Sequence, residues 1–589
     1  MADRITELLE VIYGNSLGRA TAIQLRELLE SRLPEIESRG GGDSELALDE
    51  KDAFVITYGD QFRGSREPPL HYLHSFAMER LKEVVSGIHI LPFFPFSSDD
   101  GFSIIDYREV NPDFGQWKHV DEIGKDFKLM SDLVLNHCSA KSSWFREFLR
   151  GSEDYQNYFI TVPRGTDVSM IVRPRALPLL TPFETTRGEE LVWTTFSDDQ
   201  VDLNFAEPKV LLEMIDVFLF HVAHGIQVIR LDAIAYVWKE LGHPSIHHDK
   251  THAIVKLFRA VVDRYLPWVI ILTETNVPHK ENISYFGNGS DEAHMIYQFS
   301  LPPLVLDAFI REDASHLKKW AGELPEIEGP ITYFNFLASH DGVGLTPTHG
   351  ILSEAEIKNL LSEVDRRGGL ISYKATAESK IPYEANINYR EAIAEASLSD
   401  AEKVRKFLAS QAVMLSMVGV PGIYVHSLLG SGNFREGVAE TGMNRTINRE
   451  KLDFDTLRRE LEEPNSLRDG IFNGFINMLS IRRDLAAFHP RGGQQIIATP
   501  GSLFCVKRSS VDGAEEILCL INVGSGKSDL TIKGEDLPRS IGLEEPKELW
   551  DLISGRKLES RENDRGRRIG VGPWEVLWIS GSPPGRKAR

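Results

Sequence analysis

Two stretches, Gly225-Ile-Gln-Val-Ile-Arg-Leu-Asp232 and Val269-Ile-Ile-Leu-Thr-Glu274, decide how this chain folds. Each is a short run of mostly apolar residues that ends on a carboxylic acid. Runs of this length and composition predict strands that are buried on both faces, as in a parallel sheet. Because parallel barrels carry their chemistry at the carboxyl ends of the strands, Asp232 and Glu274 stand where a site is expected.

Six further apolar runs of the same kind are separated by longer stretches with helical patterns. Eight apolar strands that alternate with helices predict an α/β fold in which the parallel sheet closes on itself, a (β/α)8 TIM barrel. The predicted strands are Ala53–Tyr58, Gly87–Pro92, Phe127–Asn136, Ile226–Asp232, Val269–Glu274, His294–Phe299, Ile331–Leu337 and Gly419–Val425.

The chain is too long, at 589 residues, for one ordinary core, so we expect additional segments around the barrel. Two amphipathic helices and a break at Gly40-Gly41-Gly42 open the chain, two connections are too long for simple loops, and the end has short strands with Gly turns. The predicted parts are an N-terminal helical extension (1–50), the catalytic barrel (51–137, 202–345 and 400–489), an inserted domain B (138–201), an inserted B′ region (346–399) and a C-terminal all-β domain (490–589).

The composition of the chain limits which partners the protein is expected to bind and where in the cell it is expected to act. The formal net charge of −21 disfavours nucleic acid, whose binding depends on clustered Lys and Arg that neutralise phosphates. The apolar runs are too short to span a bilayer, and Met1–Glu10 has no apolar signal core. Three cysteines give neither a disulfide framework nor a metal-like spacing. We therefore expect a cytoplasmic protein that binds neither nucleic acid nor a membrane, and whether it forms a homodimer stays open. The basic tail Gly585–Arg589 is expected to be disordered.

The two strand-end acids fit the chemistry of glycosidic bond cleavage with retention. That reaction needs one carboxylate that attacks the anomeric carbon and a second carboxyl group, about 5–5.5 Å away, that protonates the leaving oxygen. Arg230 shares a strand face with Asp232 and would keep that carboxylate ionised. Asp341 could stabilise positive charge on the sugar ring, and His137 could bind a sugar hydroxyl. Each of these residues alone could equally be structural, as a helix cap, an ion pair or a buried histidine.

Taken together, four ordered segments resemble the conserved blocks of the α-amylase superfamily, glycoside hydrolase family 13. The resemblance spans residues 50–580 and implies Asp232 as nucleophile, Glu274 as acid/base and Asp341 as transition-state stabiliser. It also implies that Arg230, His137 and His340 bind the −1 sugar. The four segments are Asp132-Leu-Val-Leu-Asn136-His137, Gly225-Ile-Gln-Val-Ile-Arg230-Leu-Asp232, Leu272-Thr-Glu274 and Phe336-Leu-Ala-Ser-His340-Asp341.

Finer features resemble the sucrose phosphorylase group of that family. The resemblance implies that Asp99 and Arg449 hold glucose hydroxyls, that Phe102 and Phe196 form an apolar platform, and that Gln200 belongs to the sugar-binding set. The chain departs from the group at three positions on the acceptor side: Asn276 replaces His, Asp100 replaces Ala, and Glu384 replaces Gln. The similar segments are Ile56-Thr-Tyr-Gly-Asp60, Ser98-Asp99-Asp100-Gly101-Phe102, Arg173-Pro174-Arg175, Gln200-Val-Asp-Leu203 and Ile447-Asn448-Arg449.

Wider stretches, such as Thr273-Glu-Thr-Asn-Val-Pro-His-Lys280, look most like glucosylglycerate phosphorylases of the same subfamily. This implies a hexosyltransferase that reversibly converts 2-O-α-D-glucosylglycerate and phosphate to α-D-glucose 1-phosphate and D-glycerate, through a covalent glucosyl-enzyme. Sucrose or sucrose-6-phosphate phosphorylase, or a related α-glucosidase or transglucosylase, remains the alternative. A non-catalytic amylase-like protein associated with a transporter is the second alternative, although it would be expected to lack the acids and to carry an anchor.

Both acceptors of that reaction are anions, so an acidic protein needs a local positive site for them. Phosphate is a co-substrate, and we expect no cofactor and no metal, since Asn136 alone does not make a calcium site. The expected acceptor and phosphate residues are Arg173, Arg175, Tyr236, Asn276, Tyr383 and Glu384, with His279, Lys280 and His349 as further cationic candidates.

Overall fold

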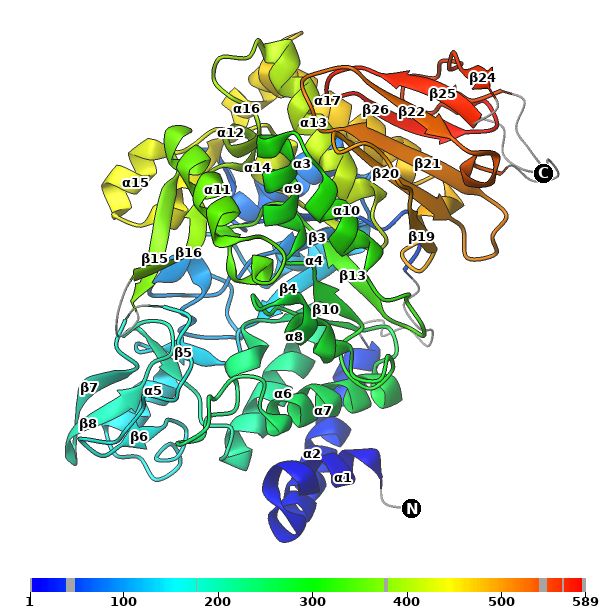
Figure 1. The fold of residues 1–589 in the computed structure, drawn as a ribbon. Helices are drawn as coiled ribbons and strands as arrows, with labels where there is room; N and C mark the ends of the chain where they lie inside the picture. Colours follow the sequence, from blue (N-terminus) through cyan, green and yellow to red (C-terminus); the bar gives the residue numbers. More distant parts are fainter. Residues whose placement is uncertain are drawn as a thin grey trace.

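Eight parallel strands form a closed barrel at the centre of the molecule (Figure 1). The computed structural model describes residues 3–38, 48–175, 177–375, 380–539, 548–563 and 566–584, so the predicted break at Gly40–Gly42 and the basic tail from 585 to 589 lie outside the described residues. The barrel prediction is confirmed, and each strand falls within one of the eight predicted runs. The barrel strands are β1 (Phe54–Thr57), β3 (Gly87–Ile90), β4 (Lys128–Leu133), β10 (Ile226–Leu231), β11 (Ile270–Thr273), β12 (Met295–Tyr297), β13 (Thr332–Asn335) and β17 (Val420–Tyr424).

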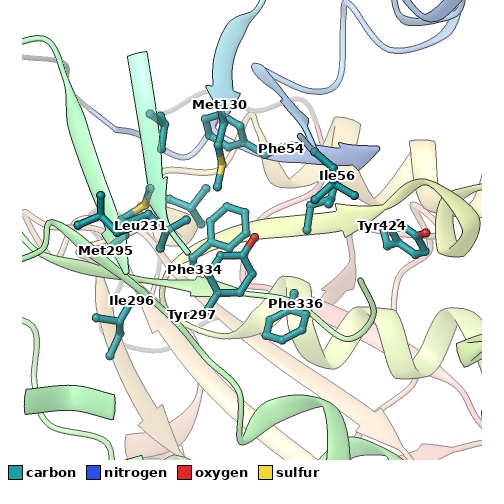
Figure 2. Packing of buried hydrophobic residues seen from close by; sticks show 14 of the residues in the cluster. Phe54, Ile56, Met130, Leu231, Met295, Ile296, Tyr297, Phe334, Phe336 and Tyr424 are labelled. Atoms are coloured by element: carbon teal, nitrogen blue, oxygen red, sulfur yellow. The ribbon is translucent and has the colours of Figure 1, made fainter. Parts of the chain in front are cut away.

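Large side chains fill the barrel interior, so the barrel is a packed core with its site at one end. Figure 2 shows rings and aliphatic chains from different strands meeting there, among them Phe54, Met130, Tyr297 and Phe334. The Phe334 ring lies 4.8 Å from that of Tyr297 and 6.2 Å from that of Phe54, in tilted and edge-to-face arrangements that aromatic pairs prefer. This packing fixes the register of the strands and therefore the positions of the residues that follow them.

Helices surround the barrel and shield the outer faces of its strands (Figure 1). Several begin with a capping box. At the start of α11 (Glu354–Arg366) the Ser353 hydroxyl accepts from the Glu356 N–H while the Glu356 carboxylate accepts from the Ser353 N–H. The main helices on the barrel are α3 (Pro69–Arg80), α4 (Trp117–Asp126), α6 (Pro208–Ala223), α7 (Asp249–Tyr265), α9 (Leu301–Arg311), α10 (Ser315–Gly322), α13 (Asp400–Ser416), α16 (Phe454–Leu461) and α17 (Leu467–Arg482).

Two insertions stand over the carboxyl ends of the barrel strands. The first follows β4 and contains β5 (His137–Ser139), α5 (Ser143–Leu149), β6 (Thr161–Val162), β7 (Leu180–Thr185), β8 (Gly188–Trp193) and β9 (Gln200–Asp202). The second follows β13 and contains β14 (Val343–Gly344), α11 (Glu354–Arg366), β15 (Leu370–Ala375), β16 (Lys380–Asn386) and α12 (Tyr389–Ile393). Beyond β17 come α14 (Val425–Leu428) and α15 (Arg435–Thr441), and β18 (Leu452–Asp453) pairs with β2 (Phe62–Arg63).

The N-terminal helices α1 (Arg4–Tyr13) and α2 (Asn15–Ser38) pack against α7 and α6 on the outside of the barrel (Figure 1). Buried Ile5, Leu9 and Ile12 supply the apolar face of α1. The Arg32 guanidinium donates to both carboxylate oxygens of Asp216 on α6, at 2.6 and 2.8 Å, and so fixes how α2 lies. Among the described residues, no helix is both long and apolar enough to cross a membrane.

Two antiparallel sheets form the C-terminal part of the chain, beside α13 and α17 (Figure 1). Their strands are β19 (Gly493–Ile496), β20 (Leu503–Ser509), β21 (Glu516–Asn522), β26 (Val576–Ser580) and β23 (Trp550–Asp551) in one sheet, and β22 (Ser528–Ile532), β25 (Gly566–Val571) and β24 (Arg561–Asn563) in the other. The buried Arg508 guanidinium joins this region to the barrel, because it donates to the carbonyls of Ser416, His489 and Gly493 at 3.0–3.2 Å.

Replacing Arg508 with Met is expected to lower the free energy of unfolding by about 3 kcal/mol, because the buried Ser416 carbonyl and two part-buried carbonyls each lose a hydrogen bond from the guanidinium. The midpoint of urea denaturation would report the change. Arg568→Met is the matched control, since this exposed arginine of the same region pairs with Asp529 on the surface. An equal loss in the two variants would contradict the role of Arg508.

Candidate active site

A cavity of about 370 Å³ opens at the carboxyl ends of the barrel strands, and the three predicted catalytic acids line it. Asp232 directly follows β10 and Glu274 directly follows β11. Leu231 and Thr273 are register partners in the two strands, so the next residue of each places its acid beside the other. Adjacent strands lie about 4.8 Å apart, close to the separation that a retaining pair of carboxyl groups needs.

One guanidinium bridges the two strand-end acids. Arg230 Nη1 lies 2.6 Å from Asp232 Oδ1, and Arg230 Nη2 lies 3.8 Å from Glu274 Oε1. Arg230 also contacts Asp132 on β4, whose other oxygen bonds to the His89 ring at 2.7 Å. The backbone N–H of Ala233 donates to Glu274 Oε2 at 2.9 Å. The carboxyl groups of Asp232 and Glu274 are therefore held in fixed orientations on one side of the cavity.

Burial controls the protonation of this pair. It raises the pKa of Glu274, while Arg230 and the Ala233 N–H oppose the rise. Burial raises the pKa of Asp232 as well, and repulsion from Glu274 raises it further, although Arg230 opposes the rise. The prediction from sequence considered only Arg230 and left out the effects of burial and of the second acid. Two buried, interacting acids hold a proton between them more tightly than separated ones. The shorter contact with Arg230 favours Asp232 as the ionised partner and Glu274 as the acid.

Asp341 is held differently, by two arginines. Arg445 Nη1 lies 2.5 Å from Asp341 Oδ1, and Arg449 Nη2 lies 3.7 Å from the same oxygen. Although burial opposes it, Arg445 and the other cations keep the pKa of Asp341 far below its usual value. Arg445 also forms a two-pronged pair with Glu384, with contacts of 2.6 and 3.1 Å. The neighbouring cations thus favour the ionised form of Asp341 in the cavity.

The predicted sugar-binding residues surround the same acids. The His340 ring stacks on Phe102, with centroids 4.6 Å apart, and Phe196 lies edge-on to Tyr236. His137 Nε2 already has protein partners, the Phe102 carbonyl at 3.0 Å and the Gln200 amide at 3.1 Å, so its ring is fixed before any ligand arrives. Arg449 lies behind these residues, and its Nη1 is 3.6 Å from Asp99 Oδ1. The cavity lining includes Asp99, Phe102, His137, Phe196, Gln200, Asp232, Glu274, His340 and Asp341.

The segment that carries Asp99 and Phe102 has a strained backbone. Asp99 and Asp100 each have φ of 51°, and Gly101 has φ of 117°, where an added Cβ would lie 2.6 Å from the Pro92 carbonyl. Asp199 from the first insertion fastens this turn, because its Oδ2 accepts hydrogen bonds from three serine hydroxyls. These serines are Ser97, Ser98 and Ser103.

Asp199→Ala should therefore release the turn and misplace Asp99 and Phe102. We expect kcat/KM for the glucosyl donor to fall about 10²-fold, mainly through KM, because displacements of about 1 Å have effects of that size. Steady-state kinetics would measure the change. Asp198→Ala is the control, since this exposed neighbour is not part of the serine cluster. A drop confined to kcat would argue against a positioning role.

The acceptor-side residues that the sequence predicts also line the cavity. Arg175 reaches over the Phe196 ring and pairs with Asp99 at 3.1 Å, while Arg173 is exposed. His279, Lys280 and His349 are not among the residues that line the cavity, so the structure gives them no part in this anion site. The six predicted acceptor-side residues that line the cavity are Arg173, Arg175, Tyr236, Asn276, Tyr383 and Glu384.

Two cations of this cavity, Arg445 and Lys374, and one positioning residue, Asp132, were not predicted from the sequence. Arg445 could have been found, because it lies two residues before the segment Ile447-Asn448-Arg449, which resembles the sucrose phosphorylase group. Lys374 stands in the second insertion with no motif around it. Its position depends on how that insertion folds over the barrel.

The ammonium group of Lys239 lies beside Asn136, the residue that was considered for a calcium site. Lys239 Nζ lies 2.7 Å from Asn136 Oδ1 and 3.0 Å from Asp202 Oδ2, and its side chain is buried. These oxygens are therefore already balanced by a cation, and the position does not fit calcium, which takes six to eight oxygen ligands. Within the described part of the chain, no group of three or more His, Cys, Asp or Glu residues is arranged to hold a metal.

Comparison with known proteins gives consistent matches over most of the chain. Residues 72–342 match the family model for the alpha amylase catalytic domain. The chain is 55% identical over 584 residues to a glucosylglycerate phosphorylase of Spirochaeta thermophila, covering 98% of each chain. It is 46% identical to one of Allomeiothermus silvanus, covering 88% of this chain and 92% of that protein. The solved structure of sucrose 6F-phosphate phosphorylase from Thermoanaerobacter thermosaccharolyticum superposes with a TM-score of 0.70 at 25% identity, covering 81% of this chain and 94% of that one.

Proposed function

Since the chain belongs to the glucosylglycerate phosphorylase family, within the α-amylase superfamily, we propose that it catalyses reversible phosphorolysis of 2-O-α-D-glucosylglycerate. The products are α-D-glucose 1-phosphate and D-glycerate. Membership of the family makes the protein a glycosyltransferase-type phosphorylase of glucosides. The observation that carries the mechanism is the Arg230 guanidinium, which holds Asp232 and Glu274 together beside one cavity.

In the first half-reaction Asp232 Oδ2, the oxygen not paired at 2.6 Å with Arg230, attacks C1 of the glucosyl unit. The bond from C1 to the glycerate oxygen breaks, and Glu274 donates its proton to that oxygen. Asp341 stabilises the positive charge that develops on the ring, because its carboxylate stays ionised. Glycerate leaves, and the glucosyl unit remains as an ester of Asp232.

In the second half-reaction a phosphate oxygen attacks C1 and the ester bond to Asp232 breaks. Glu274, now a carboxylate, takes a proton from the incoming phosphate and returns to its starting state. Phosphate approaches at this stage because esterification has removed the negative charge of Asp232. Net retention and ping-pong kinetics follow from these two displacements.

The electrostatics of the cavity support anionic acceptors. Arg173, Arg175, Lys374 and Arg445 lie on its walls, although the whole protein carries a formal charge of −21. A local positive wall offsets the long-range repulsion that an acidic protein exerts on phosphate and glycerate. The proposal includes phosphate as a co-substrate and no cofactor, and the Lys239 ammonium group lies beside Asn136 and Asp202.

A coupled assay for glucose 1-phosphate tests the proposed reaction. Purified protein is incubated with glucosylglycerate, sucrose or sucrose 6-phosphate, each with and without phosphate. We expect glucose 1-phosphate from glucosylglycerate only when phosphate is present. Higher kcat/KM with either sucrose substrate would reject the named substrate, and release of free glucose at the same rate without phosphate would reject phosphorolysis.

A further inference from the structure

Four cationic side chains line the catalytic cavity, and carboxylates of the protein already balance two of them. Arg175 pairs with Asp99 at 3.1 Å. Arg445 pairs with Asp341 at 2.5 Å and with Glu384 at 2.6 Å. These two arginines therefore have part of their charge engaged before any substrate enters. An anionic acceptor would have to compete with the protein's own carboxylates for them.

Lys374 differs from these arginines, because its ammonium group has no counter-ion among the described residues. It is half-buried in the cavity wall, and no residue of the described chain forms an ion pair or a side-chain hydrogen bond with it. The fourth cation, Arg173, is exposed and makes a long hydrogen bond of 3.5 Å to the Leu177 carbonyl. A partly desolvated charge without a partner is unfavourable in the free protein, and a bound anion would relieve that cost.

The position of Lys374 is set by a sheet that adjoins the acceptor end of the site. Lys374 lies on β15 opposite Ile381 of β16, and a bulge between Ser372 and Tyr373 shifts the pairing just before it. β16 in turn pairs with β14, where Gly344 is the partner of Glu384. The sheet is thus anchored to the segment that follows Asp341.

Glu274 identifies which end of the cavity receives the acceptor. It must contact the oxygen that joins the two halves of the substrate, so the leaving group lies on its side of the glucosyl unit. Asn276, two residues beyond Glu274, lies against Gly344 of β14, so close that an added Cβ on this glycine would approach its amide to 2.6 Å. The acceptor end of the cavity therefore borders the sheet that carries Lys374.

We propose that Lys374 binds the anionic group of the acceptor, a glycerate carboxylate in one direction of the reaction and a phosphate oxygen in the other. This inference rests on the proposed function, which supplies an anion in both directions. A lysine ammonium is a point charge on a flexible stem, so it can follow anions of different shape, whereas an arginine fork favours one planar geometry. Lys374 is thus a specificity residue that selects charged acceptors over neutral ones.

The test uses α-D-glucosyl fluoride as a donor without a phosphate or carboxylate group, so that only the acceptor carries the anion. Initial rates are measured with D-glycerate, with phosphate, and with glycerol, in which a hydroxymethyl group replaces the carboxylate. The variants are Lys374→Met and Lys374→Arg in the full chain. Lys380→Met is the matched control, because this exposed lysine of β16 is not in the cavity lining.

For Lys374→Met we expect KM to rise at least about tenfold for D-glycerate and for phosphate, while the rate with glycerol is unchanged. A rise for one anion alone would contradict the shared role and limit Lys374 to that anion. Lys374→Arg should retain most of the preference for anions, and Lys380→Met should match the wild type. KM values for both anions within twofold of wild type, or a parallel loss with glycerol, would overturn the inference. If the wild-type enzyme transferred glucosyl units to phosphate but not to D-glycerate, the proposed substrate would be rejected. The KM for phosphate would then still test the role of Lys374.

Discussion

Asp232→Asn is expected to lower kcat/KM on the order of 10⁵-fold, because the amide cannot form the glucosyl ester. The loss should be equally large with α-D-glucosyl fluoride as donor, since that donor still requires a nucleophile. Asn matches Asp in shape, and Asp132 still balances Arg230 when the charge of Asp232 is removed. The variant should therefore fold normally.

Intact-protein mass spectrometry separates a nucleophile from a residue that only binds sugar. Protein given glucosyl fluoride without an acceptor should gain the mass of one glucosyl unit, and Asp232→Asn should gain none. Peptide mapping should place the label on Asp232. A variant that retains more than about one hundredth of wild-type activity, or a label on another residue, would remove the nucleophile assignment.

Stability provides the control for this variant. Burial raises the pKa of Asp232, so the folded state holds that proton more tightly than the unfolded state does. The free energy of unfolding therefore falls as pH rises through the folded-state pKa of Asp232, because the buried carboxylate then becomes charged. Asn carries no charge, so the variant lacks this pH dependence. The thermal midpoint of Asp232→Asn at neutral pH should therefore be equal to or above that of the wild type. A lower midpoint would attribute the lost activity to unfolding instead.

The barrel could be predicted from sequence because its signals are local. A strand buried on both faces must be almost wholly apolar, and the register of β10 with β11 then places Asp232 beside Glu274 without further information. His340 and Asp341 lie five and six residues beyond the end of β13, so the strand pattern alone does not place them and the family resemblance was needed. Residues that extend a strand by one or two positions inherit their location from the strand, so sequence periodicity is sufficient to place them.

The rest of the site depends on contacts between segments that are far apart in sequence. Arg445 reaches Asp341 and Glu384 only because the second insertion folds back over the barrel. Lys239 fills a position between Asn136 and Asp202 that no single motif describes. Neither strand patterns nor a family resemblance gives the balance of charges in the cavity, because that balance is a property of the packed insertions.

Glu274→Gln is expected to give a result that depends on the leaving group. With glucosylglycerate, kcat should fall about 10³-fold, because the glycerate oxygen cannot leave without a proton. With α-D-glucosyl fluoride and phosphate, the fall should be less than about tenfold, because fluoride leaves unprotonated and phosphate attacks as an anion. Transfer from the fluoride to the hydroxyl of glycerate should stay impaired, since that acceptor must lose a proton to Glu274.

The pH profile distinguishes an acid/base role of Glu274 from a structural one. Burial raises the pKa of Glu274, and the acid acts in its protonated form, so the wild-type rate with glucosylglycerate should fall as pH rises through that raised pKa. Glu274→Gln has no proton to lose and should lack this limb of the profile. Because Asp232 must be ionised, the opposite limb, where the rate falls with decreasing pH, should persist in the variant with the fluoride donor. If both limbs remained in Glu274→Gln, or if the fluoride donor were as slow as glucosylglycerate, the proton would have to come from another group.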